Sequence, residues 1–341
     1  MTSKKYDIFG IGGAIFDLEY HVEDSFFEEV SLQKGVRTLV TDAEQTHIIN
    51  MLHNKGYKPT LSEGGGSAAN SLTCARAFGS EVYFCCKVVS DYSGSIYLAD
   101  MESKQIHMNE NNMYEADPSH CTGRCLALVS NDAERTMATS LGVSNDFSIE
   151  DIDLEAVKQS KYMMIEGYLL EAEHSRKVCD YLQLKAQEYG VKIVLTLSDP
   201  VLVQKNRDHF LALLEKGIDI IVGNADEALA LTNTDTHSAA VMSMMQYNAA
   251  YAITLGPDGV AIFNGDSVHF IKAKSCKCVD TLGAGDCFAG AFIHGLSEGK
   301  RWSESANLAN ICASKIVSRE GPRIKQHEAD TIQSKFAGIT A

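Results

Sequence analysis

The chain has 341 residues, of which 45% are hydrophobic and 22% charged, and its formal net charge is −15 at pH 7. This composition is typical of an ordinary globular protein with enough residues to bury a large core. The acidic balance argues against nucleic-acid or anionic-membrane partners, because both require clustered Lys and Arg. No apolar run approaches the ~20 residues of a membrane span.

Ten cysteines are scattered along the chain, without the spacing of a zinc site or of a C-x-x-C redox pair. Most of them lie in apolar segments, where a Cys side chain behaves as a small hydrophobe. This usage predicts a reducing compartment, the cytoplasm.

The first predicted element is a buried strand over Tyr6–Phe16, a β-prone run that contains three glycines. Ile15 occupies the last glycine position of a G-x-G-x-x-G pattern, so a dinucleotide-binding turn is not indicated. Asp17 follows the run at once. A carboxylate just beyond a buried strand lies where α/β folds bind ligands, and a loop cap is the alternative reading.

A short strand over Arg37–Val40 and a helix over Asp42–Gly56 come next, with Asp42 as the expected N-cap. In Glu63–Leu72, three consecutive glycines then lead into a helix of small residues. Asn70 falls in the first turn of that helix, where its amide can face a ligand. The alternative is a flexible turn with an ordinary helix cap.

The chain continues with a strand over Glu81–Val89 and a helix over Ser93–Ser103. A hairpin follows, formed by Gly123–Val129 and Thr136–Ser140. Arg135 lies at the return of this hairpin, and a lone Arg is more often a solvated surface charge than a ligand contact.

From about residue 148 onward, strands alternate with helical segments. The expected strands are Tyr162–Ile165, Lys192–Leu197, Ile218–Gly223, Ala250–Leu255 and Gly259–Phe263. The expected helices are Ser175–Tyr189, Gln204–Lys216, Ala239–Asn248 and two further ones after Asp286 and Ser303. This alternation predicts a mainly parallel sheet with helices on both faces.

The stretch Val279–Phe292 has the strongest chemical signature. Gly283 and Gly285 allow a sharp turn and a close approach to a ligand. The helix expected to begin near Asp286 directs unpaired N–H groups at an anion in that turn. An anion cradle beside a carboxylate is what phosphoryl transfer to an alcohol requires. A helix N-terminus capped by Asp286 or Thr281 is the alternative.

The two glycine-rich blocks resemble the signature regions of the ribokinase (PfkB-type) family of carbohydrate and nucleoside kinases. Further features occur in the order of that family, and the resemblance covers roughly residues 6–322. They are Asp17, Asp91 in a Val-Ser-Asp turn, Asn224-Ala225-Asp226-Glu227, Thr254-Leu255-Gly256 with Gly259, and Asn310 on a helix leading to Gly321.

The resemblance implies an α/β fold, a ribokinase-like three-layer α/β/α sandwich with a mainly parallel central sheet and a small β-sheet lid. It implies a single kinase domain over residues 1–341, with the lid inserted from about 18–41 and 108–140. The family's enzymes transfer the γ-phosphoryl group of ATP to an alcohol and use Mg²⁺.

The resemblance also implies residue roles. Asp286 is expected to be the general base, and the turn Gly283-Ala284-Gly285 is expected to be the anion hole. The acceptor would be bound by Asp17, Gly65, Gly66, Asn70, Arg135 and Tyr168. The nucleotide would be bound by Asn224, Thr254, Gly256, Thr281 and Asn310, with Glu227 holding Mg²⁺ through water.

The substrate is expected to be a nucleoside, adenosine first, because Ile165–Leu169 is similar to a Gly-aromatic element of the adenosine-kinase branch. Tyr168 could then stack on a base, unless it is a core aromatic. A sugar kinase on the same fold is the first alternative. A non-catalytic ligand-binding relative is the second, and an intact Asp286 with its glycine turn argues against it.

The residues leave open a monomer or a homodimer paired through the lid. They also leave open whether a monovalent cation activates the protein.

Overall fold

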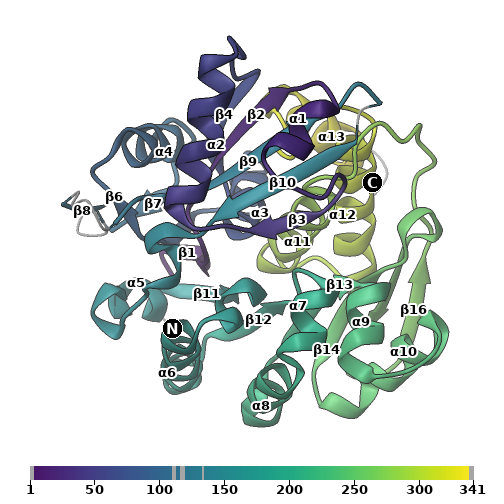
Figure 1. Ribbon diagram of the computed structural model, residues 1–341. Helices are drawn as coiled ribbons and strands as arrows, with labels where there is room; N and C mark the ends of the chain where they lie inside the picture. The colour runs from purple at the N-terminus through teal and green to yellow at the C-terminus, as the bar shows by residue number, and fades with distance from the viewer. Residues whose placement is uncertain (1–3, 110–112, 116–119, 133, 338–341) are drawn as a thin grey trace.

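The computed structural model describes residues 4–109, 113–115, 120–132 and 134–337 (Figure 1). These residues form a nine-stranded sheet, a five-stranded sheet and a two-stranded sheet. Helices cover both faces of the largest sheet, so the expected three-layer α/β/α arrangement is confirmed. We call the five-stranded sheet, together with helices α1 and α2, the lid.

The large sheet has the strand order β16-β15-β14-β13-β12-β11-β1-β5-β7. Its neighbours pair in parallel from β14 to β7, whereas β15 and β16 are antiparallel additions at one edge. The strands are β1 (Tyr6–Ile11), β5 (Val82–Cys85), β7 (His107–Met108), β11 (Ser160–Ile165), β12 (Lys192–Thr196), β13 (Ile220–Asn224), β14 (Ala250–Thr254), β15 (Val260–Phe263) and β16 (Val268–Ile271).

Alternate strand residues of the large sheet belong to two separate hydrophobic clusters. Ile8 and Met164 pack on one face, while Phe9 and Met163 pack on the other, as the period-2 geometry of a strand requires. The first face is covered by α3 (Ser67–Ala77), α11 (Ala284–Ser297), α12 (Trp302–Val317) and α13 (Gln326–Ala337). The second is covered by α5 (Leu154–Lys158), α6 (Glu173–Tyr189), α7 (Pro200–Lys205), α8 (Arg207–Gly217), α9 (Ala225–Thr232) and α10 (His237–Ser243).

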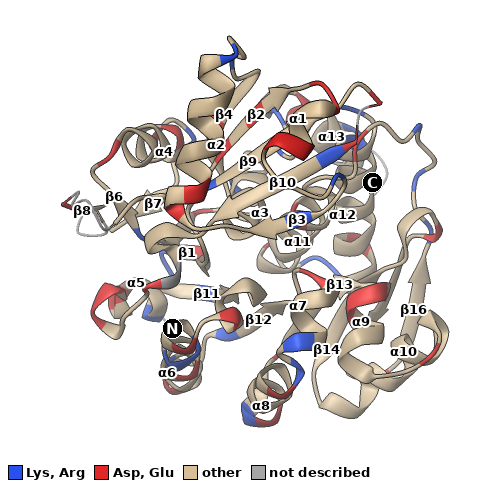
Figure 2. Cartoon of the chain, in the orientation of Figure 1, with Lys and Arg blue, Asp and Glu red and all other residues tan. Residues whose placement is uncertain are grey.

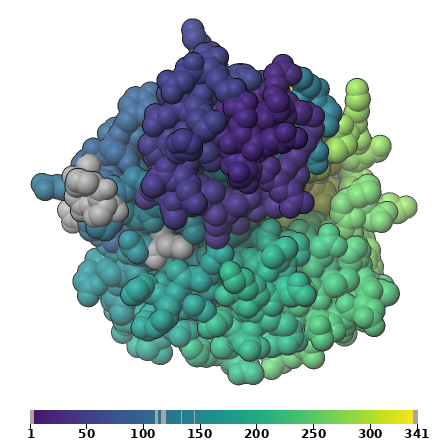
Figure 3. Space-filling view, in the orientation of Figure 1, coloured from purple at the N-terminus to yellow at the C-terminus, as the bar shows by residue number. Residues whose placement is uncertain are grey.

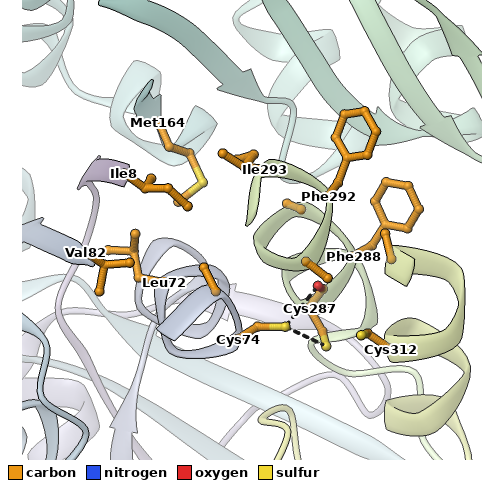
Figure 4. Close-up of a cluster of buried hydrophobic side chains, with 14 of the residues drawn as sticks. Ile8, Leu72, Cys74, Val82, Met164, Cys287, Phe288, Phe292, Ile293 and Cys312 are labelled. Carbon is orange, nitrogen blue, oxygen red and sulfur yellow. Dashed lines mark hydrogen bonds between the residues drawn. The ribbon is translucent and has the colours of Figure 1, made fainter. Parts of the chain in front are cut away.

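Helices α3 and α11 approach each other closely on the first face (Figure 4). A Cβ at Gly290 would lie 2.0 Å from the carbonyl oxygen of Ser71, so only glycine fits there. Beside this contact, the Sγ atoms of Cys74 and Cys287 are 3.3 Å apart, and Cys312 lies next to them. The tight packing fixes how the two helix N-termini lie relative to each other.

The lid strands have the order β3-β10-β9-β2-β4. They are β2 (Ile15–His21), β3 (Arg37–Leu39), β4 (Leu61–Gly65), β9 (Gly123–Val129) and β10 (Arg135–Ser140). One face of this sheet packs on α1 (Ser25–Glu29) and α2 (Asp42–Asn54) through a hydrophobic cluster of its own, which includes Tyr20 and Leu126. The other face carries Asp17, Glu19 and Cys125 toward a cavity.

The run Tyr6–Phe16 is not one strand, as expected, but parts of two. It contributes β1 to the large sheet and the start of β2 to the lid. The chain turns at Gly12, where a Cβ would lie 2.2 Å from Glu166 Oε2. Asp17 therefore lies within a lid strand, not in a loop after the first strand.

Other expected boundaries also differ. Thr41, not Asp42, caps α2, because Thr41 and Glu44 form a capping box. The expected strand 81–89 divides into β5 and β6 (Val88–Val89), and β6 pairs with β8 (Met113–Tyr114). The expected helix 204–216 divides at Asn206 into α7 and α8. The expected helix 239–248 is the short α10 followed by a 3-10 turn, Met244–Tyr247.

The lid also differs from its expected segments 18–41 and 108–140. Strand β4 belongs to the lid sheet, whereas β7 and β8 pair outside it. Positions 110–112, 116–119 and 133 of the expected range lie outside the described residues. Strand β16 was not expected. Within the described ranges, no helix combines the length and the apolar composition that a membrane span needs.

Candidate active site

A cavity of about 1510 Å³ lies between the lid and the large sheet. Its floor includes Glu166, which follows β11, and Asn224, which ends β13. Its roof includes lid residues such as Glu19 and Met137. In Figure 3 the lid residues (purple) form the upper lobe above residues of the large sheet and its helices (green). Ligands of open α/β sheets bind at this edge, beyond the carboxyl ends of the parallel strands.

Asp286 lies in the first turn of α11, a helix that begins at Ala284, two residues earlier than Asp286 itself. Ser67 Oγ donates to Asp286 Oδ1 at 2.6 Å, and Asn70 Nδ2 donates to Asp286 Oδ2 at 3.0 Å. Burial raises the pKa of Asp286, while these two donors and the charge of Arg323 oppose that rise. The carboxyl group is thus held in place by α3, a helix more than 200 positions earlier in the chain.

The start of α11 contains two glycines with different surroundings, Gly283 at the N-cap and Gly285 within the first turn. Gly283 has φ 73°, and a Cβ there would lie 2.4 Å from the Cβ of Pro322. A Cβ at Gly285 would meet no atom within 4 Å, and this residue lines the cavity. Ala284 does not line it, and its N–H donates to the carbonyl of Thr281 at 3.2 Å. The space beside Gly285 is therefore the open part of the expected anion hole.

The expected acceptor residues Asp17 and Asn70 face the same cavity, as does Gly66. Gly65 lies behind Asp17, since its Cβ would be 2.0 Å from Asp17 Oδ2. Gly66 has φ 97°, and a Cβ there would be 2.3 Å from the carbonyl oxygen of Gly13. Burial raises the pKa of Asp17 to about 7.

Glu166 is a site residue that the sequence reasoning missed. Its Oε2 accepts a hydrogen bond from the backbone N–H of Ala68 at 2.8 Å, at the N-terminus of α3. Burial raises its pKa to about 7. A carboxylate directly after a buried strand was the signal that singled out Asp17, and the same signal applied to β11 would have found Glu166.

Tyr168 and Arg135 both line the cavity. The Arg37 guanidinium lies 4.9 Å from the centroid of the Tyr168 ring, so a cation covers one face of that ring. Arg135 is not a free surface charge: its Nη1 donates to Asp280 at 2.8 Å and its Nη2 donates to Glu19 at 2.9 Å. Arg135 therefore joins the lid to the turn before α11.

Asn224 and Glu227 form a capping box at the start of α9, and both line the cavity. The Glu227 carboxylate accepts from the Asn224 backbone N–H at 2.9 Å and from the Asn224 amide at 2.8 Å. Burial raises the pKa of Glu227 to about 7. Among the described residues, no group of three or more His, Cys, Asp or Glu could hold a metal ion. A Mg²⁺ ion at this site would thus depend on phosphate and water, which suits that ion.

Three expected nucleotide residues do not line the cavity, whereas Thr281 does. Thr254 ends β14 beside Asn224, and Gly256 follows two residues later with φ 58°. Asn310 is buried and donates to the carbonyls of Ile271 at 3.2 Å and Lys272 at 3.3 Å. In this geometry Asn310 tethers the segment after β16.

Comparisons with known proteins agree with this arrangement. A family model described as "pfkB family carbohydrate kinase" matches residues 55–329. The chain is 25% identical over 337 residues to the adenosine kinase of Dictyostelium discoideum, which covers 93% of this chain and 96% of that relative.

Two solved structures of kinases are also similar to this chain. The adenosine kinase of Sinorhizobium meliloti is 30% identical, with a TM-score of 0.86, and the match covers 97% of this chain and 99% of that one. A probable sugar kinase of Rhizobium etli CFN 42 is 26% identical, with a TM-score of 0.86 and coverage of 98% and 99%. These similarities extend over nearly the whole chain, including the lid.

Proposed function

The chain belongs to the pfkB family of carbohydrate kinases, and on that premise we propose that it transfers the γ-phosphoryl group of ATP to the 5′-hydroxyl of adenosine. The observation that carries the kinase reaction is the position of Asp286. This buried carboxyl group faces the cavity in the first turn of α11, held by donors from α3. The relatives named adenosine kinase, one of them 30% identical over 97% of this chain, support the choice of acceptor.

Asp286 acts as the general base in this proposal. An alcohol is a weak nucleophile at neutral pH, so a positioned carboxylate that takes its proton contributes to the rate. The acceptor oxygen then attacks the γ-phosphorus, the bond to the β,γ-bridging oxygen breaks, and ADP leaves. Ser67 and Asn70 hold the carboxylate toward the cavity while the proton is transferred.

The turn before α11 stabilises the charge of the transferred group. The N-terminus of a 14-residue helix carries unpaired N–H groups and the positive end of its dipole. Gly285 leaves the space that a phosphate oxygen would fill. Asn224 and Glu227 would hold Mg²⁺ through water, and the bound ion would neutralise negative charge on the phosphates.

The acceptor is held by polar groups at one end and by apolar groups at the other. Glu166 is buried and Asp17 is half-buried; both carboxyl groups line the cavity and can bind ribose hydroxyls, and Tyr168 supplies an aromatic face for a base. Lid residues such as Met137 cover this space and exclude water, which limits hydrolysis of ATP.

Other properties follow from composition. Figure 2 shows the Lys and Arg positions of the described residues scattered over many elements rather than gathered along one of them, which supports a small-molecule partner rather than a nucleic acid. No disulfide bond joins the cysteines of the described residues, which favours a reducing compartment such as the cytoplasm. Sedimentation distinguishes a monomer from a homodimer paired through the lid. Kinase assays with and without K⁺ test activation by a monovalent cation.

A kinase assay with ATP, Mg²⁺ and a panel of acceptors tests this proposal. We expect adenosine to give the highest kcat/KM, with inosine, guanosine, ribose and fructose as comparisons. Turnover of a free sugar with none of any nucleoside would overturn the nucleoside assignment and leave the sugar kinase.

The variant Asp286→Asn tests the mechanism in the same assay. We expect kcat to fall at least ~10²-fold because the general base is lost, with an unchanged thermal melting temperature relative to a Ser267→Ala surface control. Near-normal turnover by Asp286→Asn would rule out Asp286 as the base.

A further inference from the structure

The amide of Asn70 is held between two groups that constrain it differently. Its Nδ2 donates to Asp286 Oδ2 at 3.0 Å, and its Oδ1 accepts from Arg323 Nε at 2.8 Å. These contacts join α3, the start of α11 and the segment between α12 and α13 into one chain of hydrogen bonds. Arg323 lies at the outer end of this chain of hydrogen bonds and also lines the cavity.

An Asn amide can present either its oxygen or its nitrogen to a neighbour, and its environment decides which. A guanidinium has only donors, so Arg323 can pair only with the oxygen of Asn70. The NH₂ group must then face Asp286. With a neutral, apolar side chain at position 323, the amide could turn by 180° and present its oxygen to Asp286. In that orientation it would accept a hydrogen bond from a protonated carboxyl group.

The Arg323 guanidinium is buried, and only part of its hydrogen-bonding capacity is used. Its side chain is 7% exposed, and its Nη1 donates to Asp100 Oδ2 at 2.7 Å. Asp100 also pairs with Lys104. The Nη2 group of Arg323 is buried without a hydrogen-bond partner among the residues that the structure describes. A buried cation with an unpaired amino group is costly to stability, so stability alone does not explain its position.

The other titratable groups near Asp286 are mostly acidic. Asp17 on β2, Glu166 after β11 and Glu227 on α9 interact with it electrostatically, as does Tyr168. The positive charge of Arg323 lowers the pKa of Asp286, against the rise that burial causes. This charge and the effect of Arg323 on Asn70 therefore work in the same direction, toward an ionised Asp286.

We propose that Arg323 is a positioning residue that fixes the amide of Asn70 with its NH₂ group toward Asp286 and thereby keeps the base ionised. This inference rests on the proposed function, in which Asp286 must be ionised to accept a proton. Without Arg323, the pKa of Asp286 rises, because a donor and a positive charge are lost. The acidic limb of the pH–rate profile then moves to higher pH.

The test is the pH dependence of kcat/KM for wild type, Arg323→Met and Arg323→Lys, with Lys104→Met as a matched control. Lys104 shares Asp100 with Arg323 but does not contact Asn70. For Arg323→Met we expect the acidic limb to move up by about one pH unit, so that activity falls roughly tenfold along that limb and recovers at the alkaline side of it. Arg323→Lys, which keeps a donor-only side chain, should restore most of the wild-type profile. Lys104→Met should leave it unchanged.

Two outcomes would overturn the inference: an unshifted acidic limb in a folded Arg323→Met, or an equal loss at every pH. If Arg323→Met does not fold, Arg323→Gln replaces it. The amide introduced by Arg323→Gln can either donate or accept, so it does not fix the orientation of Asn70. The acidic limb of the Arg323→Gln profile should therefore lie at higher pH than that of Arg323→Lys, and acidic limbs at the same pH would contradict the proposal. Near-normal turnover by Asp286→Asn would rule out Asp286 as the base, the part of the proposed function on which this inference rests, whereas an inactive Asp286→Asn with an unshifted Arg323→Met would refute only this inference.

Discussion

Asp17, Glu166 and Glu227 are carboxyl side chains whose burial along the cavity raises their pKa to about 7. Near neutral pH each of them can therefore gain or lose a proton when a ligand arrives. A protonated carboxyl group can donate to a substrate oxygen, and an ionised one can accept from a hydroxyl. Acceptor binding should consequently be coupled to proton uptake or release.

The same shifts predict how stability depends on pH. Glu166 has a folded pKa near 7 and an unfolded pKa near 4.5, so its contribution to stability is present below about pH 4.5 and is lost as the pH rises through about 7. Glu166→Gln removes this titration and retains an oxygen that can accept from Ala68 N–H. We expect it to melt a few degrees above wild type at pH 8, equivalent to ~1 kcal/mol, with a much smaller difference at pH 5.

Differential scanning fluorimetry of the ligand-free protein from pH 5 to pH 8 measures this effect. Glu215→Gln, an exposed position on α8, is the control and should follow the wild-type curve. A constant offset between Glu166→Gln and wild type at all pH values would contradict the buried-acid explanation.

Residues with a local sequence signal could be placed at the cavity from the sequence, and residues without one could not. Asn70 and Asp286 stand in glycine-rich helix starts, where local backbone chemistry indicates a ligand site. Arg323 has no such local signal, because its role depends on a contact with a residue 253 positions away. Asn310 lies on the expected helix, and its amide binds the carbonyls of Ile271 and Lys272, two contacts that the sequence did not indicate.

At the scale of elements, the N-terminus of α11 has two glycines in different settings: Gly283 packs against Pro322, and Gly285 faces the cavity. Gly283 needs its left-handed φ of 73° and its contact with Pro322. Gly285 is a helical residue with open space in front of it. Alanine is favoured over glycine inside a helix by roughly 0.5–1 kcal/mol, so these two glycines should respond differently to the same substitution.

We predict that Gly285→Ala retains or slightly raises the melting temperature, while kcat/KM for ATP falls by roughly tenfold or more, about 1.4 kcal/mol or more of transition-state stabilisation. The methyl group would fill the space that a phosphate oxygen needs. Gly283→Ala should lose both stability and activity, because its Cβ would lie 2.4 Å from Pro322. Melting curves and steady-state kinetics of the pair check this prediction. Normal ATP kinetics in Gly285→Ala would exclude this turn from phosphate binding.

Element types could be predicted more reliably than element boundaries. The alternation after residue 148 identified the strands from β11 to β15, because buried parallel strands are short apolar runs between helices. The division of Tyr6–Phe16 was not predictable from that pattern. Both halves are β-prone, and the turn at Gly12 is imposed by the distant Glu166 and Ala68, which leave no room for a side chain.

At the scale of the whole molecule, Arg135 connects two bodies that have separate hydrophobic cores. The lid packs around its own cluster, and the large sheet packs between two others. The ion pair of Arg135 with Asp280 is 2.8 Å long and crosses from the lid to the turn before α11. It therefore holds the lid over the cavity at the point where the phosphate is expected.

We predict that Arg135→Ala lowers kcat/KM by roughly 10- to 100-fold, about 1.4–2.7 kcal/mol, and changes the melting temperature little, because partly exposed ion pairs contribute at most ~1 kcal/mol to stability. Lys34→Ala is the matched control. Lys34 also pairs with two carboxylates, Asp24 and Asp132. Lys34 lies between α1 and β3, Asp24 at the start of α1 and Asp132 between β9 and β10, so both ion pairs stay within the lid. Equal kinetic losses in the two variants would show that Arg135 acts only within the lid.

The hydrogen bonds around Asp286 also set the order in which the site can be completed during synthesis. Ser67 and Asp286 are 219 positions apart, and Asn70 and Arg323 are 253 positions apart. At translation rates of about 5–20 residues per second, roughly 13–50 s separate the synthesis of Asn70 from that of Arg323. A chain still attached to the ribosome thus carries Asp17 and Glu166 long before it carries Asp286, the proposed base, and Arg323, the residue proposed to orient Asn70. The nascent protein cannot transfer phosphate until almost all of the described chain has emerged.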